Sequence, residues 1–365
     1  MKAMMPESEV ELARMVAEAE GPLRIVGGGT RAVGCCDGAV LSVAGLSGID
    51  LYEPGSLTLV ARAGTPVAEI EVALAQEGQR LAFEVPDMRG LLGRSGASTI
   101  GGVVAANASG PRRVQGGACR DFLLGVRFVD GAGQVVTNGG RVMKNVTGYD
   151  LVKLMAGARG TLGVLSEVSF KVLPVPERAL TLACDGLDTG DAVAAMSAAL
   201  GTPFDVTGAA HRGGLTYVRL EGFAESVAYR AGALAAALSR FGDWAEVADP
   251  WAGIRDVAGF HDQAGDVWRV SVKPSDAPGV IAQAGAEDAM MDWGGGLIWL
   301  RMAAGTALRV RLGDLQGHAT LVRGAPDTVA RLGAFHPEPA PLAALTRGLR
   351  ARFDPRNILN RGLMA

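Results

Sequence analysis

The sequence is poor in cysteine and histidine and has no long apolar run. Its four cysteines are Cys35, Cys36, Cys119 and Cys184. They match no metal-ligand spacing, and adjacent Cys35 and Cys36 make a poor disulfide framework, so we expect reduced thiols and no metal in a cytoplasmic protein. No stretch of eighteen or more apolar residues is present, which predicts that no helix inserts into a membrane. The first residues also lack the apolar core and cleavage site of a secretory signal.

An excess of charge of one sign is lacking too. The formal net charge is −3 with both signs interspersed, so we expect neither a nucleic-acid partner nor an anionic membrane surface. Glycine, in contrast, is abundant: 52 of 365 residues, without a period. Such glycines indicate tight turns and places where the backbone approaches a ligand closely. The length accommodates two domains with separate cores.

Apolar periodicity and turn residues predict the elements of the first half. Helices are expected at 8–19, 65–78 and 150–156, and strands at 23–26, 39–43, 57–63, 122–129, 134–137 and 163–173. Pro174 and Pro176 mark the predicted domain boundary.

The second half has a different pattern. Helix-like segments at 225–241 and 341–353 alternate with strand-like segments at 216–220, 268–272, 297–302 and 319–322. This order predicts an α+β layer of antiparallel strands with helices on one face. We therefore expect three parts, at 1–174, 175–340 and 341–365.

The first motif is RIVGGGTR, residues 24–31. Without Cβ atoms, Gly27, Gly28 and Gly29 can turn sharply and direct several backbone N–H groups at one anion. A diphosphate suits such a turn, with the Thr30 hydroxyl as an added donor, while Arg31 either supplies charge or is simply solvated. Neither the Rossmann fingerprint nor the P-loop pattern is present. Taken alone, the triplet fits a plain turn equally well.

The second motif spans residues 93–136 and begins GRSGASTIGG. Ser98 and Thr99 stand where a helix would start, so their hydroxyls and the first free N–H groups can hold another phosphate. Gly101 and Gly102 allow a flat ring system to lie against the backbone. A closely packed glycine helix would explain these glycines, but not the arginines that follow at positions 112, 113 and 120.

The third motif spans residues 144–174. A loop with Gly148, a helix capped by Asp150 and a tight turn at 160–163 precede a strand that we expect to be edge-like. Such a strand can offer its backbone N–H and C=O groups to a nucleobase or to the polar edge of a flavin.

The order of these motifs resembles the PCMH-type FAD-binding domain of the vanillyl-alcohol oxidase family. The segments that carry the resemblance are GGGT (27–30), AGTP (63–66), STIGG (98–102), GPRR (110–113), RDFLLGVRFVDGAG (120–133), GYDL (148–151) and GTLGV (160–164). Within that family, KNVTGYDLVKLMAG (144–157) and WRVSV (268–272) resemble the FAD-binding E subunits of bacterial glycolate oxidases. RFDPRNILNRGLM (352–364) is similar to the family's closing segment.

The resemblance implies an α+β protein: a two-subdomain FAD-binding domain, a smaller substrate or cap-like domain, and a C-terminal helix and tail returning to the flavin domain. The FAD diphosphate would lie on residues 27–30 and 99–102, and the adenine and flavin edges would meet backbone near Val164. The complete set of implied FAD-binding residues is Gly27, Gly28, Gly29, Thr30, Arg31, Ser98, Thr99, Ile100, Gly101, Gly102, Asn107, Gly110, Arg113, Gly163, Val164 and Asn360.

Two residues depart from the family pattern. Arg361 stands where proline is usual, and Asn107 stands where glycine is usual in this subfamily. Covalent flavin attachment in the superfamily generally uses histidine or cysteine. None of the four histidines lies in the flavin-domain motifs, and Cys35 and Cys36 are interpreted as surface or core thiols, so we expect non-covalent FAD.

Oxidising a 2-hydroxy acid requires a cation for the carboxylate and a base for the hydroxyl. Arg269 is the best carboxylate candidate because a guanidinium binds it bidentately, although a structural ion pair would explain it equally well. His318 is the best base candidate, against the alternative of a structural histidine. The motif H-x-G-D-G-N-x-H of similar D subunits and D-lactate dehydrogenases is absent, which argues against a self-sufficient oxidase.

Three functions remain open. In the first, the chain is a flavin subunit of a glycolate oxidase that converts glycolate to glyoxylate, with a D-type flavin subunit and an iron–sulfur subunit as partners. It lacks the cysteine clusters of the iron–sulfur subunit itself. In the second, it is a stand-alone D-lactate-type dehydrogenase, and in the third, a non-catalytic flavin-binding scaffold. Each of these three functions is compatible with a cytoplasmic protein that is attached to the inner membrane only through its partners. The sequence leaves open which 2-hydroxy acid is used.

Overall fold

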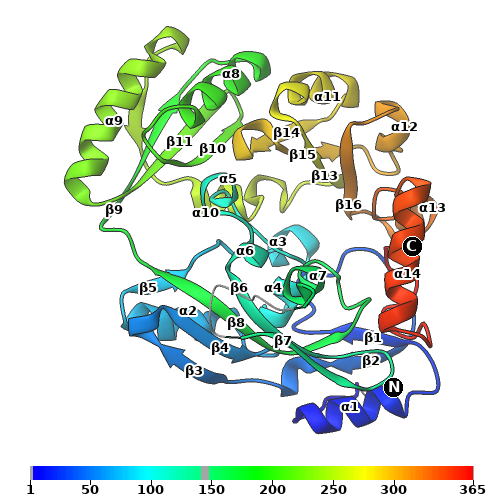
Figure 1. The fold of residues 1–365 in the computed structure, drawn as a ribbon. Coiled ribbons are helices and arrows are strands. Elements are labelled where there is room, and N and C mark those ends of the chain that lie inside the picture. The colour runs from blue at the N-terminus through cyan, green and yellow to red at the C-terminus, as the bar shows by residue number, and fades with distance from the viewer. Residues whose placement is uncertain (1–2, 141–147, 365) are drawn as a thin grey trace.

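The computed structural model describes residues 3–140 and 148–364 of the chain. Two antiparallel sheets form separate layers, with short helices between them (Figure 1). The part of the third motif at 144–147 lies outside the described residues. None of the helices described is both long and apolar enough to cross a membrane.

The lower layer in Figure 1 is a six-stranded sheet with the order β3-β4-β8-β6-β7, and β5 pairs with β8. Its strands are β3 (Ile49–Glu53), β4 (Thr58–Arg62), β5 (Gln79–Leu81), β6 (Leu123–Val129), β7 (Val135–Gly139) and β8 (Val164–Pro174). A parallel pair, β1 (Leu23–Val26) and β2 (Ala39–Ser42), lies beside it. The helices of this half are α1 (Glu9–Ala17), α2 (Val67–Gln76), α3 (Arg89–Leu92), α4 (Ile100–Ala105), α5 (Arg113–Gly116), α6 (Cys119–Phe122) and α7 (Leu151–Met155).

The expectation that residues 163–173 form an edge-like strand is wrong. β8 lies inside the sheet, paired with β4 on one side and β6 on the other. The physical reason is that the strand is buried on both faces: Val168, Phe170 and Val172 on one face are completely buried, and Ser169 on the other is buried as well. Ladder pairing with β4 begins at Glu167, so the backbone at Val164 is paired in the sheet only with β6.

The upper layer is an eight-stranded sheet with the order β12-β9-β11-β10-β14-β15-β13-β16, antiparallel throughout. Its strands are β9 (Arg178–Cys184), β10 (Val206–Arg212), β11 (Leu215–Gly222), β12 (Ala245–Val247), β13 (Asp266–Val272), β14 (Asp288–Asp292), β15 (Leu297–Met302) and β16 (Gly317–Arg323). The remaining helices are α8 (Thr189–Leu200), α9 (Ala224–Leu238), α10 (Trp251–Arg255), α11 (Ala277–Ala284), α12 (Leu308–Leu312), α13 (Pro326–Leu332) and α14 (Ala340–Phe353). The predicted antiparallel α+β layer is confirmed.

Each layer has its own apolar core. The core of the upper layer lies around Trp268 and Met196, between the outer face of the sheet and the helices α8, α9, α11 and α12. The lower core lies around Phe128 and Phe170. A third cluster, with Trp251 and Phe260, fills the space between the layers. The chain crosses between the sheets after Pro174, and α14 leads it back down the side of the molecule (Figure 1).

Candidate cofactor site

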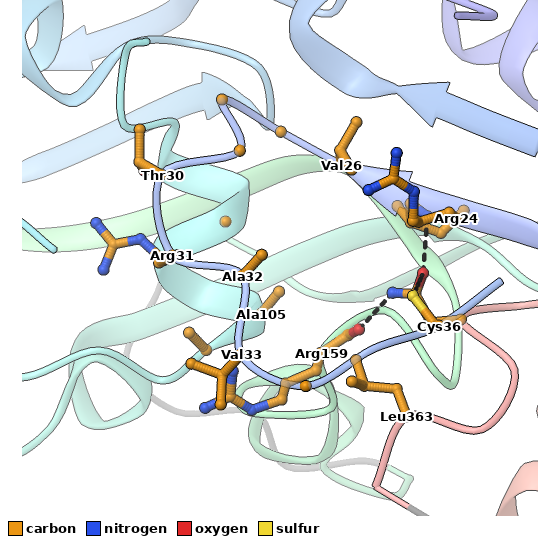
Figure 2. A pocket seen from close by; sticks show the side chains of 18 of the residues that line it. Arg24, Val26, Thr30, Arg31, Ala32, Val33, Cys36, Ala105, Arg159 and Leu363 are labelled. Carbon is orange, nitrogen blue, oxygen red and sulfur yellow. Dashed lines mark hydrogen bonds between the residues drawn. The ribbon is translucent and has the colours of Figure 1, made fainter. Parts of the chain in front are cut away.

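A cavity of about 330 Å³ lies between the turn that follows β1 and the beginning of α4. A smaller cavity of about 80 Å³ adjoins it toward the start of β8. The two share Ile25, Gly27, Gly102, Ala105, Arg159 and Asn360 among their lining residues. In Figure 2 the segment bearing Thr30, Arg31 and Val33 runs past the helix of Ala105 toward Arg159, Leu363 and Cys36. Together the cavities form an elongated site of the kind a dinucleotide needs.

Glycine is required where the turn after β1 meets the segment before α4. A Cβ on Gly28 would lie 1.5 Å from the carbonyl oxygen of Ala97, and one on Gly27 would lie 2.2 Å from Oγ1 of Thr99. Gly29 has a φ of +69°, in the left-handed region that other residues avoid. The glycines therefore let two loops close against each other and leave the backbone of the turn facing the cavity.

Two polar groups at this turn have atoms without a partner among the described residues. Oγ1 of Thr99 is buried and makes no hydrogen bond, and neither does Nε of Arg31. The Arg31 guanidinium otherwise donates to the carbonyl of Pro86 at 3.3 Å and to Oγ of Ser98 at 2.6 Å. Burial lowers the pKa of Arg31 to about 10. A buried hydroxyl and a buried cation beside glycine backbone fit an anionic cofactor group, because both are costly when unpaired.

The adjoining residues of α4 build the wall of the site. Ile100 is completely buried in the lower core. The Gly101 N–H donates to the carbonyl of Ala63 at 2.8 Å, and a Cβ on Gly101 would lie 2.6 Å from the Ala63 side chain. Gly102 lines both cavities. Small residues here keep the helix close to β4 and leave a flat backbone surface.

Asn360 closes the far end of the site. Its Oδ1 accepts from the Ile25 N–H at 2.7 Å, and its Nδ2 donates to the carbonyl of Arg159 at 2.7 Å. Gly163 and Val164 line the smaller cavity beside it. The C-terminal segment thus contacts the cavity wall although Arg361 replaces the usual proline.

Five predicted cofactor residues line neither cavity: Ser98, Ile100, Asn107, Gly110 and Arg113. Asn107 has a φ of +45°, and asparagine tolerates this conformation better than most residues, which explains how it can replace glycine. Its Oδ1 accepts from the Arg120 N–H at 3.1 Å. The Arg113 guanidinium lies over the ring of Trp293, 4.7 Å from its centroid.

Sequence reasoning missed Arg159, which lines both cavities. Its backbone is left-handed, with a φ of +52°, and its guanidinium lies 4.8 Å from the ring centroid of Phe335. Burial, followed by the charge of Arg31, lowers its pKa to about 10. The available signal was a single arginine between glycines at 157 and 160, directly before a buried strand. Cys35 and Cys36 also line the larger cavity, and burial raises the pKa of the Cys36 thiol.

The two catalytic candidates lie on neighbouring strands of the upper sheet. Arg269 of β13 pairs in register with Thr320 of β16, and His318 pairs with Ser271. Burial, then the charges of Arg113 and Arg159, lowers the pKa of Arg269 to about 10. Partial desolvation of the His318 ring, together with the charge of Arg269, lowers the pKa of that imidazole. The lowered pKa favours the neutral form of the His318 imidazole, which can accept a proton.

Comparison with known proteins agrees with this geometry. Residues 3–139 match the FAD binding domain family. The chain is 36% identical over 329 residues to the glycolate oxidase subunit GlcE of Escherichia coli K12, which covers 90% of this chain and 87% of that protein. It is 41% identical over 85 residues to the glycolate oxidase subunit GlcD of Bacillus subtilis, covering 23% of this chain and 18% of that one. A D-lactate dehydrogenase of Anaerostipes hadrus is 32% identical over 158 residues, covering 43% of this chain and 31% of that one.

Among solved structures, an alkyldihydroxyacetonephosphate synthase matches with a TM-score of 0.71 at 17% identity, covering 99% of this chain and 76% of that one. The fold and the cavity thus define an FAD-linked flavoprotein of the oxidoreductase class, and FAD is its cofactor. More particularly, the chain belongs to the family of the glycolate oxidase subunit GlcE.

Proposed function

We propose that this chain is an FAD-binding subunit of a multi-subunit glycolate oxidase, which oxidises a small 2-hydroxy acid such as glycolate to the 2-oxo acid. The observation that carries the proposal is the similarity to the GlcE subunit along nine-tenths of the chain, which includes the upper layer as well as the flavin-binding half. The D-lactate dehydrogenase match covers less than half of the chain, so it supports the cofactor more than the stand-alone alternative.

FAD is proposed to bind without a covalent link. Its diphosphate would contact the backbone of residues 27–30, the unpaired hydroxyl of Thr99 and the Arg31 guanidinium. The flavin would extend toward Val164 and Asn360 in the adjoining cavity. Of the two cysteines that line the cavity, Cys36 has a raised thiol pKa, and a protonated thiol is a poor nucleophile for covalent attachment.

Bound FAD would supply the two-electron acceptor for the substrate. In this proposal the Arg269 guanidinium binds the substrate carboxylate, and the neutral imidazole of His318 accepts the proton of the hydroxyl group. With the hydroxyl proton on His318, the C–H hydrogen and its electron pair would pass to the acceptor that FAD supplies, which would leave a C=O bond and balance protons and electrons.

The partners are proposed to be a D-type flavin subunit and an iron–sulfur subunit, which would take the electrons onward. The names of the GlcE and GlcD relatives, both subunits, support an assembly of several chains. We propose a cytoplasmic location, with any membrane attachment made through these partners.

The deciding experiment is to purify the chain alone and with its two partners, and to count flavins and measure glycolate-dependent reduction of an artificial acceptor. We expect one FAD and no activity for the chain alone, and activity for the assembly. Activity of the chain alone would identify a stand-alone dehydrogenase. A colourless chain would refute the cofactor assignment.

A further inference from the structure

Two guanidinium groups converge on one indole ring where the two layers meet, and a third arginine acts on them through its charge. Arg113 begins α5, which lies beneath the upper sheet in Figure 1, and Arg269 lies on β13 of that sheet. Both guanidinium groups lie over the indole of Trp293, at 4.7 Å and 5.1 Å from its centroid. Arg159 is close enough for its charge to lower the pKa of Arg269 as well. The cluster therefore contains cations from both layers around one aromatic ring.

Acidic groups act on this cluster only at longer range: the charge of Asp292 opposes the fall in the pKa of Arg269, and that of Asp121 opposes the fall in the pKa of Arg113. Within residues 3–140 and 148–364, none of the three arginines forms an ion pair. Arg112, which directly precedes Arg113 in the sequence, does form an ion pair, with Glu221. Like charges brought together away from water are unfavourable unless an anion joins them. The arrangement thus indicates that an anionic ligand completes it.

Trp293 is held at the cluster in a strained conformation. Its φ is +54°, which is rare for a bulky side chain. Its N–H donates to Oδ1 of buried Asp292 at 2.7 Å, and its indole Nε1 donates across the junction to the carbonyl of Gly110 at 3.1 Å. Strain of this kind persists where the surroundings enforce it, and it concentrates at ligand sites.

Arg159 lines both cavities and its charge acts on Arg269, so it links the cluster electrostatically to the cofactor site. An anion held by Arg113 and Arg269 would therefore lie next to the cofactor. We infer that Arg113, Arg159 and Arg269 form a binding site for the carboxylate of a small organic acid, with Trp293 as the residue that positions two of them. Arg113 then serves the substrate instead of a cofactor phosphate.

The identity of the acid as a 2-hydroxy acid rests on the proposed function, whereas the carboxylate site itself does not. Oxalate is a suitable probe because it carries carboxylates and has no C–H bond to oxidise. Its affinity for the FAD-loaded full chain can be measured by isothermal titration calorimetry. We expect Arg113→Met and Arg269→Met each to weaken oxalate binding about tenfold or more, because each removes a charge-assisted contact.

Matched variants separate the carboxylate site from general effects. Arg240→Met removes an exposed arginine that also lies over an aromatic ring, 4.7 Å from that of Phe241, and should leave oxalate affinity unchanged. Trp293→Phe should weaken oxalate binding with all three charges still present. If a methionine variant fails to fold, Arg113→Lys and Arg269→Lys keep the charge but lose the bidentate geometry, so each should still weaken binding.

Several outcomes would overturn the inference. One is that wild-type protein binds no oxalate, and another is that the Arg113 and Arg269 variants bind it as tightly as wild type. A third is that these variants lose FAD while inorganic phosphate, rather than oxalate, competes for the site, which would assign the cations to a cofactor phosphate. Arginine-dependent oxalate binding without oxidation of any 2-hydroxy acid, even with the partners, would support the site and refute the proposed function.

Discussion

Single residues in the cofactor cavity have polar atoms that the protein itself does not satisfy. The Thr99 hydroxyl is the clearest case, because it is buried against Gly27 and makes no hydrogen bond. Most buried hydroxyl groups in proteins have a partner, so we infer that a ligand supplies the partner of this one. The Thr99 hydroxyl should therefore contribute to the free energy of cofactor binding and not to the free energy of folding.

We predict that Thr99→Val weakens FAD binding about tenfold, since valine keeps the shape and removes the hydroxyl. The cofactor-free protein should be as stable as wild type or slightly more stable, because an unpaired buried group is lost. Fluorescence titration of FAD and thermal unfolding of the cofactor-free protein measure the two effects.

Thr65→Val is the matched control. The Thr65 hydroxyl is equally buried but accepts from the Gly48 N–H at 3.0 Å and donates to the Arg62 carbonyl at 2.7 Å. That variant should destabilise the cofactor-free protein by about 1–3 kcal/mol. A Thr99→Val protein that lost stability to the same extent and kept its FAD affinity would contradict the assignment.

Asp292 predicts a pH dependence of stability. Burial, opposed by the hydrogen bond from the Trp293 N–H, raises the pKa of Asp292 to about 7. Between about pH 4 and 7 the folded protein keeps this proton and the unfolded chain does not. The contribution of Asp292 to the free energy of unfolding therefore falls as pH rises through that window, by up to about 4 kcal/mol.

Asp292→Asn should remove this fall, since asparagine can still accept the Trp293 N–H. Urea unfolding at pH 5 and pH 8 tests this expectation. At the higher pH the free energy of unfolding of the variant should rise relative to that of the wild type. Asp262→Asn, at an exposed position, controls for the loss of one acidic group. Equal pH dependence of wild type and Asp292→Asn would show that the carboxyl is ionised throughout.

At the scale of elements, the site depends on how closely the turn after β1 packs on the segment before α4. The expected element bounds were accurate to within a few residues in the first half, including the Asp150 cap, whose Oδ1 accepts from the Lys153 N–H at 3.0 Å. The packing between elements was not visible in the sequence. Gly28 and Gly29 are adjacent in one triplet, yet glycine is required at each position for a different reason. Gly28 leaves no room for a Cβ, whereas Gly29 has a left-handed backbone.

We predict that Gly28→Ala costs about 3 kcal/mol or more and abolishes FAD binding, because its methyl group would overlap the Ala97 carbonyl and separate the two loops. Gly29→Ala should cost only about 1–2 kcal/mol, the strain of its left-handed backbone, since no atom lies within 4 Å of its Cβ position. Chemical unfolding and FAD titration of both variants test this order. Equal effects would contradict it.

At the scale of the whole molecule, a buried ion-pair network joins the two layers. Glu221 of the upper layer pairs with Arg80, at 2.7 Å, and with Arg112 of the lower layer. Arg219 of the upper layer pairs with Glu84 of the lower at 2.8 Å. Burial raises the pKa of Glu221, but the surrounding arginines outweigh it, so the pKa lies below its ordinary value. The stabilisation is therefore present at neutral pH and lost in acid.

We predict that Glu221→Gln destabilises the protein by about 3 kcal/mol at pH 7, because it leaves buried arginines without their counter-charge. The loss should begin to shrink as pH falls below about 4.5, the ordinary pKa of the carboxyl, and should disappear only below its lowered pKa in the folded protein. Glu246→Gln, which breaks an exposed pair with Arg178, should change stability by less than about 0.5 kcal/mol. Urea unfolding of both variants at pH 7 and pH 4 gives the comparison.

The sequence by itself determined the cofactor class and most of the local structure. Glycine spacing, helix caps and turn residues act between near neighbours, so GGGT, STIGG and GTLGV identified the FAD-binding family and the strands and helices around it. The same reasoning selected Arg269 and His318 by chemistry alone, without locating them relative to each other.

Only the tertiary structure decided what meets across the two layers. It placed β8 inside its sheet, because burial on both faces depends on neighbours distant in sequence. It added Arg159 to the cofactor cavity and moved Arg113 from that cavity to Trp293, 180 positions further along the chain. Long-range contacts of this kind arise from packing two separate cores against each other, and local sequence patterns contain no information on that packing.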